Sequence, residues 1–230
     1  MMRLSSILRV ALVPLALVSV EAGKPSAPAA ALARLQAGNT RFASGAAEGR
    51  PGDPSHRASL AQGPSPFAAV LSCADARVPP EAIFDAGPGD LFVVRVAGGV
   101  ADRAVLASVE QAVETLGTPL VVALGHEFCE TVSAAAAPPH GSRGPNLDFL
   151  LSAIRPAVAR SETRPGADRS RAAILSNVEE VMNALVSKSD IIRAGVAGGS
   201  VEVVGGYYEL STGQVHFSSI VGARDVSATR

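Results

Sequence analysis

Residues 67–95 read FAAVLSCADARVPPEAIFDAGPGDLFVVR, in which two apolar runs flank a more polar connection. The first run, 67–72, is apolar throughout, which is typical of a strand buried on both faces of a parallel sheet. The second run, 91–95, predicts another strand after a turn at 87–90. Between them, a Pro-Pro-Glu sequence favours a short helix over 79–84. A strand, a helix and a second strand in this order indicate a parallel pair.

The same alternation of helices and strands continues on both sides of this stretch. Apolar residues at helical spacing predict an N-terminal helix over 30–42, followed by a loop at 45–62. Downstream, the predicted elements are a helix at 103–116, a strand at 119–124 and helices at 130–137, 147–158 and 170–187. A last strand over 201–210, bulged at a Gly-Gly pair, turns into an antiparallel edge partner at 215–220. We therefore expect an α/β fold with a mostly parallel central sheet flanked by helices and a C-terminal antiparallel edge strand.

The first 22 residues have the pattern of a secretory signal peptide. Arg3 and Arg9 precede an apolar run at 10–20, and Val20 and Ala22 are the small or apolar residues that a cleavage site requires. The run is about half of the roughly 20 residues that span a bilayer, so we expect no stable membrane span in the mature chain. The protein is expected to be exported, to the periplasm or out of the cell. An uncleaved N-terminal anchor is the alternative.

The composition suits one compact domain behind this leader, since the chain has 230 residues and 47% of them are hydrophobic. We assign residues 1–22 to the signal peptide, 23–31 to a flexible lead-in, 32–222 to the folded domain and 223–230 to a tail. The charges nearly cancel, with 20 Lys and Arg against 21 Asp and Glu, and there is no Trp. We expect no nucleic-acid partner, because a basic field and a base-stacking platform are both missing from the sequence.

The chain has two cysteines, Cys73 and Cys129. In an exported protein, a disulfide between them is the usual interpretation. The residues around the two cysteines favour a different interpretation, a shared metal site. Cys73 ends the first predicted strand, His126 ends the third, and Cys129 follows three residues later. The carboxyl ends of parallel strands meet at one edge of a sheet, and two thiolates with an imidazole are a ligand set that zinc prefers. We therefore predict a zinc site made of Cys73, His126 and Cys129.

Three protein ligands would leave one tetrahedral position open, as in catalytic rather than structural zinc sites. Asp75 is the nearby candidate for a fourth ligand, and Arg77 could hold it as a bidentate partner. Asp75 on zinc would close the site, whereas Asp75 on Arg77 would leave room for water, whose pKa zinc lowers towards about 7. Because two thiolates weaken that effect, we expect a working pH above neutral. A simple surface ion pair is the alternative for Asp75 and Arg77.

Three motifs, in order and at suitable spacing, resemble the β-class carbonic anhydrase family. They are CADARVPPE at 73–81, GDLFVVRVAG at 89–98 and GHEFC at 125–129. The corresponding family patterns are C-x-D-x-R, G-D-L-F-V-x-R-x-A-G and G-H-x-x-C. Two flanking segments, LQAGNTRF at 35–42 and YELSTG at 208–213, also look like family features. The resemblance therefore covers roughly residues 30–220.

The resemblance implies an enzyme of the lyase class, a carbonate dehydratase, that uses Zn²⁺ to hydrate carbon dioxide reversibly to bicarbonate and a proton. It also implies homodimers or tetramers in which the N-terminal helix packs on a partner subunit. Matched position by position, Cys73, His126 and Cys129 are the metal ligands. Asp75 and Arg77 are the catalytic dyad that gates the fourth position and assists proton transfer.

Four positions depart from the family pattern, and one of them is Pro64, which stands where the family tends to have Gln, nine residues before Cys73. Ala76 replaces the frequent Ser between Asp75 and Arg77, Gly99 stands where Asn is common, and Glu130 stands where Gly is usual. These changes bear on substrate placement and proton transfer rather than on zinc binding. Two other functions are therefore kept open. One is hydrolysis of a related small molecule such as carbonyl sulfide or carbon disulfide, and the other is a non-catalytic zinc-binding role.

Overall fold

A sheet of five strands forms the centre of the part of the chain that the structure describes. The computed structural model describes residues 28–49, 52–137, 141–161 and 168–221. The strand order is β2-β1-β3-β4-β5, with β1 at Ala68–Ser72, β2 at Leu91–Arg95, β3 at Leu120–His126, β4 at Glu202–Tyr208 and β5 at Val215–Val221. The first four strands are parallel and β5 runs antiparallel to β4, with a register shift at Val204/Gly206. The predicted fold class, edge strand and bulge are confirmed.

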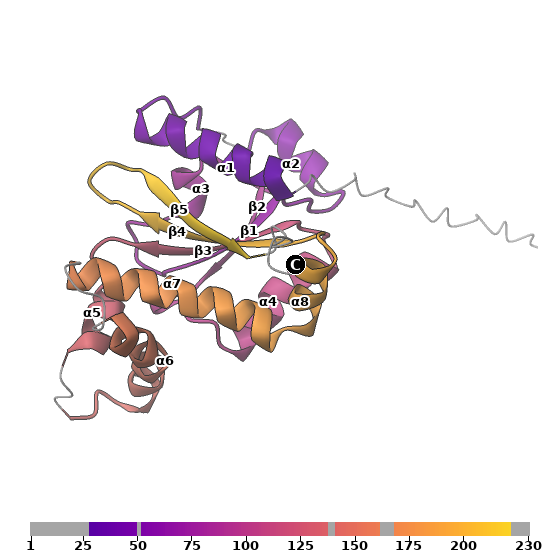
Figure 1. Ribbon diagram of the computed structural model, residues 1–230. Helices are drawn as coiled ribbons and strands as arrows, with labels where there is room; N and C mark the ends of the chain where they lie inside the picture. The colour runs from indigo at the N-terminus through magenta and orange to yellow at the C-terminus, as the bar shows by residue number, and fades with distance from the viewer. Residues whose placement is uncertain (1–27, 50–51, 138–140, 162–167, 222–230) are drawn as a thin grey trace, which may run out of the picture.

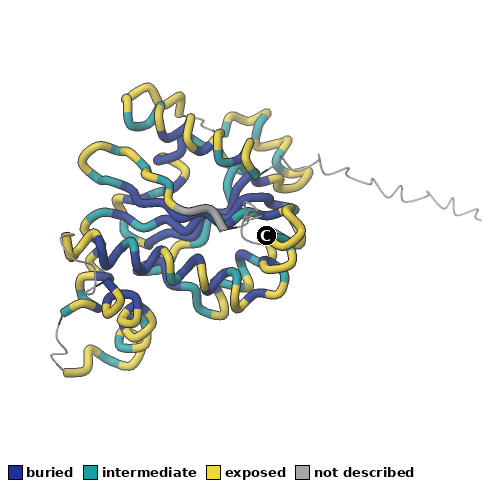
Figure 2. The backbone as a smooth tube through the Cα atoms, in the orientation of Figure 1, coloured by how far each residue is buried: buried dark blue, intermediate teal, exposed yellow. Residues whose placement is uncertain are grey.

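Helices cover both faces of this sheet (Figure 1). They are α1 at Pro28–Ala43, α2 at Pro54–Leu60, α3 at Pro80–Ile83, α4 at Arg103–Glu114, α5 at Glu130–Ala136, α6 at Pro145–Ser161, α7 at Arg169–Lys188 and α8 at Asp190–Ala197. Alternate strand residues face the two layers: Val70 and Val122 pack in the cluster that includes α1, and Leu71 and Val121 in the cluster with α4 and α8. The central strands are therefore buried on both sides, as Figure 2 shows. In the described part of the chain, no helix has the length and apolar character needed to cross a bilayer.

The N-terminal boundary of the folded domain differs from the prediction. Helix α1 begins at Pro28, so the prediction of a flexible lead-in is wrong for residues 28–31. Proline is tolerated in a first helical turn and alanine is the strongest helix former, and Ala31 is fully buried. The predicted signal peptide, the rest of the lead-in, residue 222 and the tail lie outside the described residues.

Two short helices are missing from the prediction. Helix α2 lies within the predicted loop 45–62, where the Asp53 carboxylate accepts hydrogen bonds from the backbone N–H groups of Ser55 (2.8 Å) and His56 (2.9 Å). Helix α8 is capped in the same way, by the Ser189 hydroxyl, which accepts from the N–H of Ile192. Each helix is too short for a clear apolar period, so its capping residue is the sequence signal that could have indicated it.

Helix α1 packs along one face against its own chain. Leu35 on its inner face is fully buried in the core. The Asn39 amide donates to the carbonyls of Ile83 (3.2 Å) and Gly213 (2.8 Å) and accepts from the N–H of Val215 (2.8 Å). One buried side chain thus joins α1 to α3 and to the β4–β5 hairpin.

Close approach of α1 to α3 gives a first prediction. A Cβ atom at Gly38 would lie 1.9 Å from the backbone oxygen of Phe84, so either helix would have to move. We expect Gly38→Ala to lower the free energy of unfolding by about 3 kcal/mol, as overpacking does, although alanine favours a helix. Urea unfolding measures this, with the exposed Ala33→Gly in the same helix as a control for propensity alone, worth about 1 kcal/mol. A Gly38→Ala protein as stable as the wild type would contradict the prediction.

The strand order places a topological switch point at the carboxyl edge of the sheet. Strand β1 pairs with β2 on one side and with β3 on the other, so the chain leaves β1 in one direction and later returns to its opposite side. In open α/β sheets, ligands bind at such a switch point, outside the carboxyl ends of the strands. Here that point lies between the ends of β1 and β3.

Candidate metal centre

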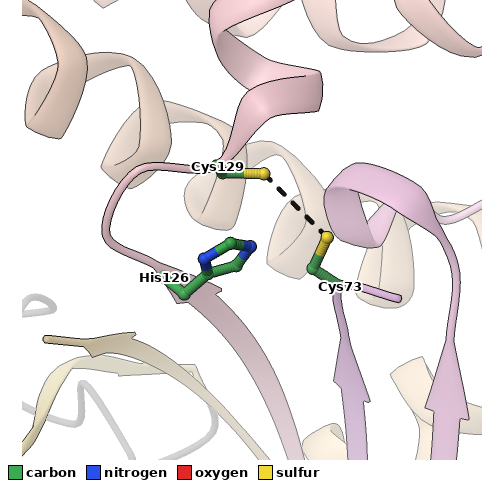
Figure 3. A group of neighbouring side chains, drawn as sticks. All are labelled: Cys73, His126 and Cys129. Atoms are coloured by element: carbon green, nitrogen blue, oxygen red, sulfur yellow. Dashed lines mark hydrogen bonds between the residues drawn. The ribbon is translucent and has the colours of Figure 1, made fainter. Parts of the chain in front are cut away.

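Cys73, His126 and Cys129 converge at this switch point (Figure 3). Cys73 follows β1, His126 is the last residue of β3, and Cys129 immediately precedes α5. One potential ligand atom from each lies within 4.8 Å of the others, and all three residues are buried. The three residues predicted to bind the metal are therefore together in space.

The two sulfurs are separated as two ligands of one ion would be. Their distance is 4.0 Å, and both cysteines are free. A disulfide would need about 2.05 Å, whereas two thiolates on a tetrahedral zinc, each about 2.3 Å from it, lie roughly 3.8 Å apart. In this structure the pair is consequently not a disulfide, and its spacing fits a shared metal.

The ring of His126 is oriented for metal binding. Its Nδ1 lies 2.9 Å from the carbonyl oxygen of Glu127, and since a carbonyl only accepts, Nδ1 carries the proton. The Nε2 lone pair is then free. Nε2 is buried and has no hydrogen-bond partner among the described residues. A buried polar atom without a partner is costly, and a metal ion between Nε2 and the sulfurs would supply the missing interaction.

The two thiols differ in acidity. The pKa of Cys73 lies below that of an ordinary thiol because the Cys129 thiol donates to its sulfur, an effect that outweighs burial; backbone N–H groups such as that of Gly98, 3.3 Å away, add to it. The pKa of Cys129 is raised by the neighbouring Cys73 sulfur and by burial. The two sulfurs thus influence each other's ionisation, and metal binding would release the proton or protons that they carry.

Asp75 is held by Arg77 and not by the cysteine and histidine group. Arg77 donates from Nε to Oδ1 (3.0 Å) and from Nη2 to Oδ2 (2.6 Å), and its backbone N–H also reaches Oδ1 (2.9 Å). The hydrogen bond from Arg77 holds the pKa of Asp75 well below its usual range. With Asp75 bound to Arg77 in this way, its carboxylate would leave the fourth position free if the three residues held a metal.

Two further sets of contacts at the site were not predicted from the sequence. Arg95, at the end of β2, donates to the backbone carbonyls of Cys73 (3.1 Å) and Asp75 (2.5 Å). Arg77 also donates to the carbonyl of Phe128 (3.2 Å), a residue in the left-handed region with φ 54°. Both arginines therefore hold the loops that carry the cysteines. The sequence signal that could have indicated a role for Arg95 is its place at the end of the predicted strand next to β1.

The departures from the family pattern are readily accommodated. Gly99 has φ +65°, a conformation that favours glycine, and a Cβ there would be in ordinary van der Waals contact with the backbone of Ser72 and Cys73, at 3.7 Å or more. Glu130 is exposed in the first turn of α5, where a negative charge suits the helix dipole. The carboxylate of Glu127 accepts from the N–H of Leu210 (3.1 Å), which ties the loop to the hairpin.

The fold and this group define an α/β protein with a buried Cys-His-Cys centre able to hold a metal ion. The family model described as carbonic anhydrase matches residues 68–215. Carbonic anhydrase 2 of Mycobacterium tuberculosis (strain H37Rv) is 40% identical over 201 residues, covering 85% of this chain and 95% of that protein. The carbonic anhydrase of Mycolicibacterium smegmatis is 37% identical over 203 residues, covering 86% and 96%. This chain belongs to the β-carbonic anhydrase family.

Solved structures agree on the fold. A tetrameric β-carbonic anhydrase of Sordaria macrospora superposes with a TM-score of 0.63 at 25% identity, over 79% of this chain and 93% of that one. The family resemblance expected from the three motifs is therefore confirmed.

Proposed function

We propose that this protein is a zinc-dependent enzyme that hydrates carbon dioxide reversibly to bicarbonate and a proton. The observation that carries the proposal is the buried Cys73, His126 and Cys129 group at the switch point, with an unpartnered imidazole nitrogen. Membership of the β-carbonic anhydrase family supports it. When bound to these three residues, zinc supplies the Lewis acidity that makes water a nucleophile near neutral pH.

The other residues act around that position. Asp75 stays ionised because its pKa is held low by Arg77. Its carboxylate can accept a hydrogen bond from the attacking water and orient it, but it cannot keep a proton at neutral pH. The released proton must therefore pass to solvent or buffer. Arg77 holds Asp75 away from the fourth ligand position and presents a half-exposed guanidinium, a suitable neighbour for the bicarbonate anion.

Stopped-flow hydration of carbon dioxide by the purified mature protein tests the proposal, with zinc determined on the same sample. We expect fast hydration with one zinc per chain. One zinc per chain with no hydration would contradict the proposal. Rates on carbonyl sulfide and carbon disulfide, measured on that sample, would then distinguish a related hydrolase from a non-catalytic zinc protein.

The 4.0 Å separation of the two sulfurs gives a second prediction. Without metal, a small movement would let Cys73 and Cys129 form a disulfide, their two electrons and two protons passing to oxidised glutathione. Zinc should prevent this by binding both thiolates. Thiol titration of the denatured protein is expected to find both thiols after oxidation of the zinc form and neither after oxidation of the metal-stripped form. Free thiols in the stripped, oxidised protein would disprove it.

We propose that the chain is exported with cleavage after Ala22, because Arg3, Arg9 and the apolar run at 10–20 form a signal-peptide pattern. The N-terminal sequence of the protein from the periplasmic fraction should then begin at Gly23. Retention of Met1 in a cytoplasmic protein would contradict this.

We also propose a homodimer or tetramer, since a fungal family member with the same fold is described as tetrameric. Light scattering on the purified protein measures the mass directly. A monomer at micromolar concentration would contradict the proposal.

A further inference from the structure

Helix α7 touches both halves of the metal centre. It crosses the sheet beside β3 and β4 (Figure 1). A Cβ at Gly125, just before His126, would lie 2.7 Å from the Cγ2 of Val178 and 2.9 Å from the Cγ2 of Ile174, so α7 packs directly on the strand that delivers the histidine. Between these two residues, the Asn177 amide donates to the carbonyl oxygen of Gly98 (2.8 Å). One turn of one helix therefore sets the position of both segments.

Gly98 in turn contacts a predicted ligand. Its φ is +71°, which favours glycine, and a Cβ there would lie 2.5 Å from the Cδ1 of Ile154, so a larger residue would also displace that side chain. The backbone N–H of Gly98 donates to the Sγ of Cys73 (3.3 Å). Asn177 is almost fully buried. Two consecutive hydrogen bonds thus lead from the core of α7 to the sulfur of Cys73.

We propose that Asn177 is a positioning residue of the metal centre, which holds the Gly98 N–H on the Cys73 sulfur. The inference rests on the proposed function in taking Cys73 as a zinc ligand. A hydrogen bond to a thiolate withdraws electron density from the sulfur, and such outer partners tune the ligand and the metal. Here the bond would offset part of the charge that two thiolates donate. A structural role alone, satisfying the buried Gly98 carbonyl, is the competing explanation.

Asn177→Leu, similar in size but without a donor, separates the two explanations in the full chain. Cobalt(II) replaces zinc as a spectroscopic probe. Loss of the N–H···S bond raises the energy of the sulfur lone pair, so the thiolate-to-cobalt charge-transfer band should move to lower energy. We also expect zinc affinity, measured by competition with a chelator, to fall about tenfold. An unchanged band, with or without a fall in affinity, would overturn the inference.

Met182→Ala is the matched control. Met182 is also buried in α7, but it contacts β4 at Gly205, away from Gly98. It should lose folding stability without a shift of the cobalt band. If Asn177→Leu does not fold, Asn177→Ala gives the same test, since alanine removes the donor and favours the helix. A wild-type chain that binds neither metal would overturn the proposed function, whereas identical cobalt spectra in wild type and variant would overturn only the role of Asn177.

Discussion

Replacing His126 with alanine should remove zinc from the protein and lower carbon dioxide hydration by roughly 1,000-fold or more. Mutating a residue that only hydrogen-bonds a metal ligand typically lowers metal affinity or activity about 10- to 100-fold. His126 is itself a predicted ligand, so its loss should have a larger effect. Its Nε2 is the one nitrogen aimed at the sulfur pair. Cys73→Ser should have a similar effect, because an alcohol is a much weaker zinc ligand than a thiolate.

The controls for this prediction come from the chain itself. His216 on β5 is half-exposed and pairs with Glu209, so His216→Ala should keep both zinc and activity. Zinc per chain by atomic emission and stopped-flow hydration are measured on all three variants. Full activity in His126→Ala or Cys73→Ser would sink the proposed mechanism, since the group of Cys73, His126 and Cys129 would then not be needed for catalysis.

Removal of Arg77 should be the next most damaging change, although it leaves the three metal ligands in place. Arg77→Ala frees the Asp75 carboxylate from its bidentate partner. A released carboxylate, two residues from Cys73, can occupy the fourth metal position and exclude water. We expect kcat/KM to fall about 100-fold, as misplaced catalytic groups commonly cause, with one zinc per chain retained.

A double-mutant cycle shows whether blocking by Asp75 causes that loss. If it does, the double variant Asp75→Ala with Arg77→Ala should recover part of the activity that Arg77→Ala loses, because the blocking group is gone. If the double variant is no better than Arg77→Ala, the gating role of the dyad is wrong and Arg77 acts in another way.

The acidity of Asp75 also restricts the pH dependence of activity. Its pKa lies below the ordinary value of 3.8, so the stabilisation from the ion pair is fully present above that value. The stabilisation disappears only as the pH falls through the lowered pKa. A loss of hydration on going from mildly alkaline to neutral pH must then come from another group, and Asp75→Asn should not abolish that slope.

The sequence predicted the convergence of the cysteines and histidine for a simple reason. Parallel strands end at one edge, so Cys73 and His126, which end buried strands, had to meet there. The contact between Asp75 and Arg77 could be predicted just as readily, because residues two positions apart can form a bidentate pair. These predictions depended on neighbours along the chain and on strand direction alone.

The structure adds contacts that no local pattern contains. The hydrogen bond from Asn177 to Gly98 joins residues 79 positions apart and depends on the angle at which α7 crosses the sheet. Arg95 reaches two carbonyls only because Ser72 and Arg95 are in register. The position of α1 also depends on contacts between residues far apart in the sequence. The sequence therefore predicted the helix but not its contacts with α3 and the β4–β5 hairpin.

The placement of the predicted ligands after β1, at the end of β3 and just before α5 has a consequence for biosynthesis. All three predicted ligand residues have been synthesised once Cys129 has been added, but β4 and α7, which flank and support β3, are still to come. A nascent chain therefore contains every ligand without the geometry that joins them. Metal loading should be a late event that follows completion of the chain, and a product truncated before α7 should fail to retain zinc.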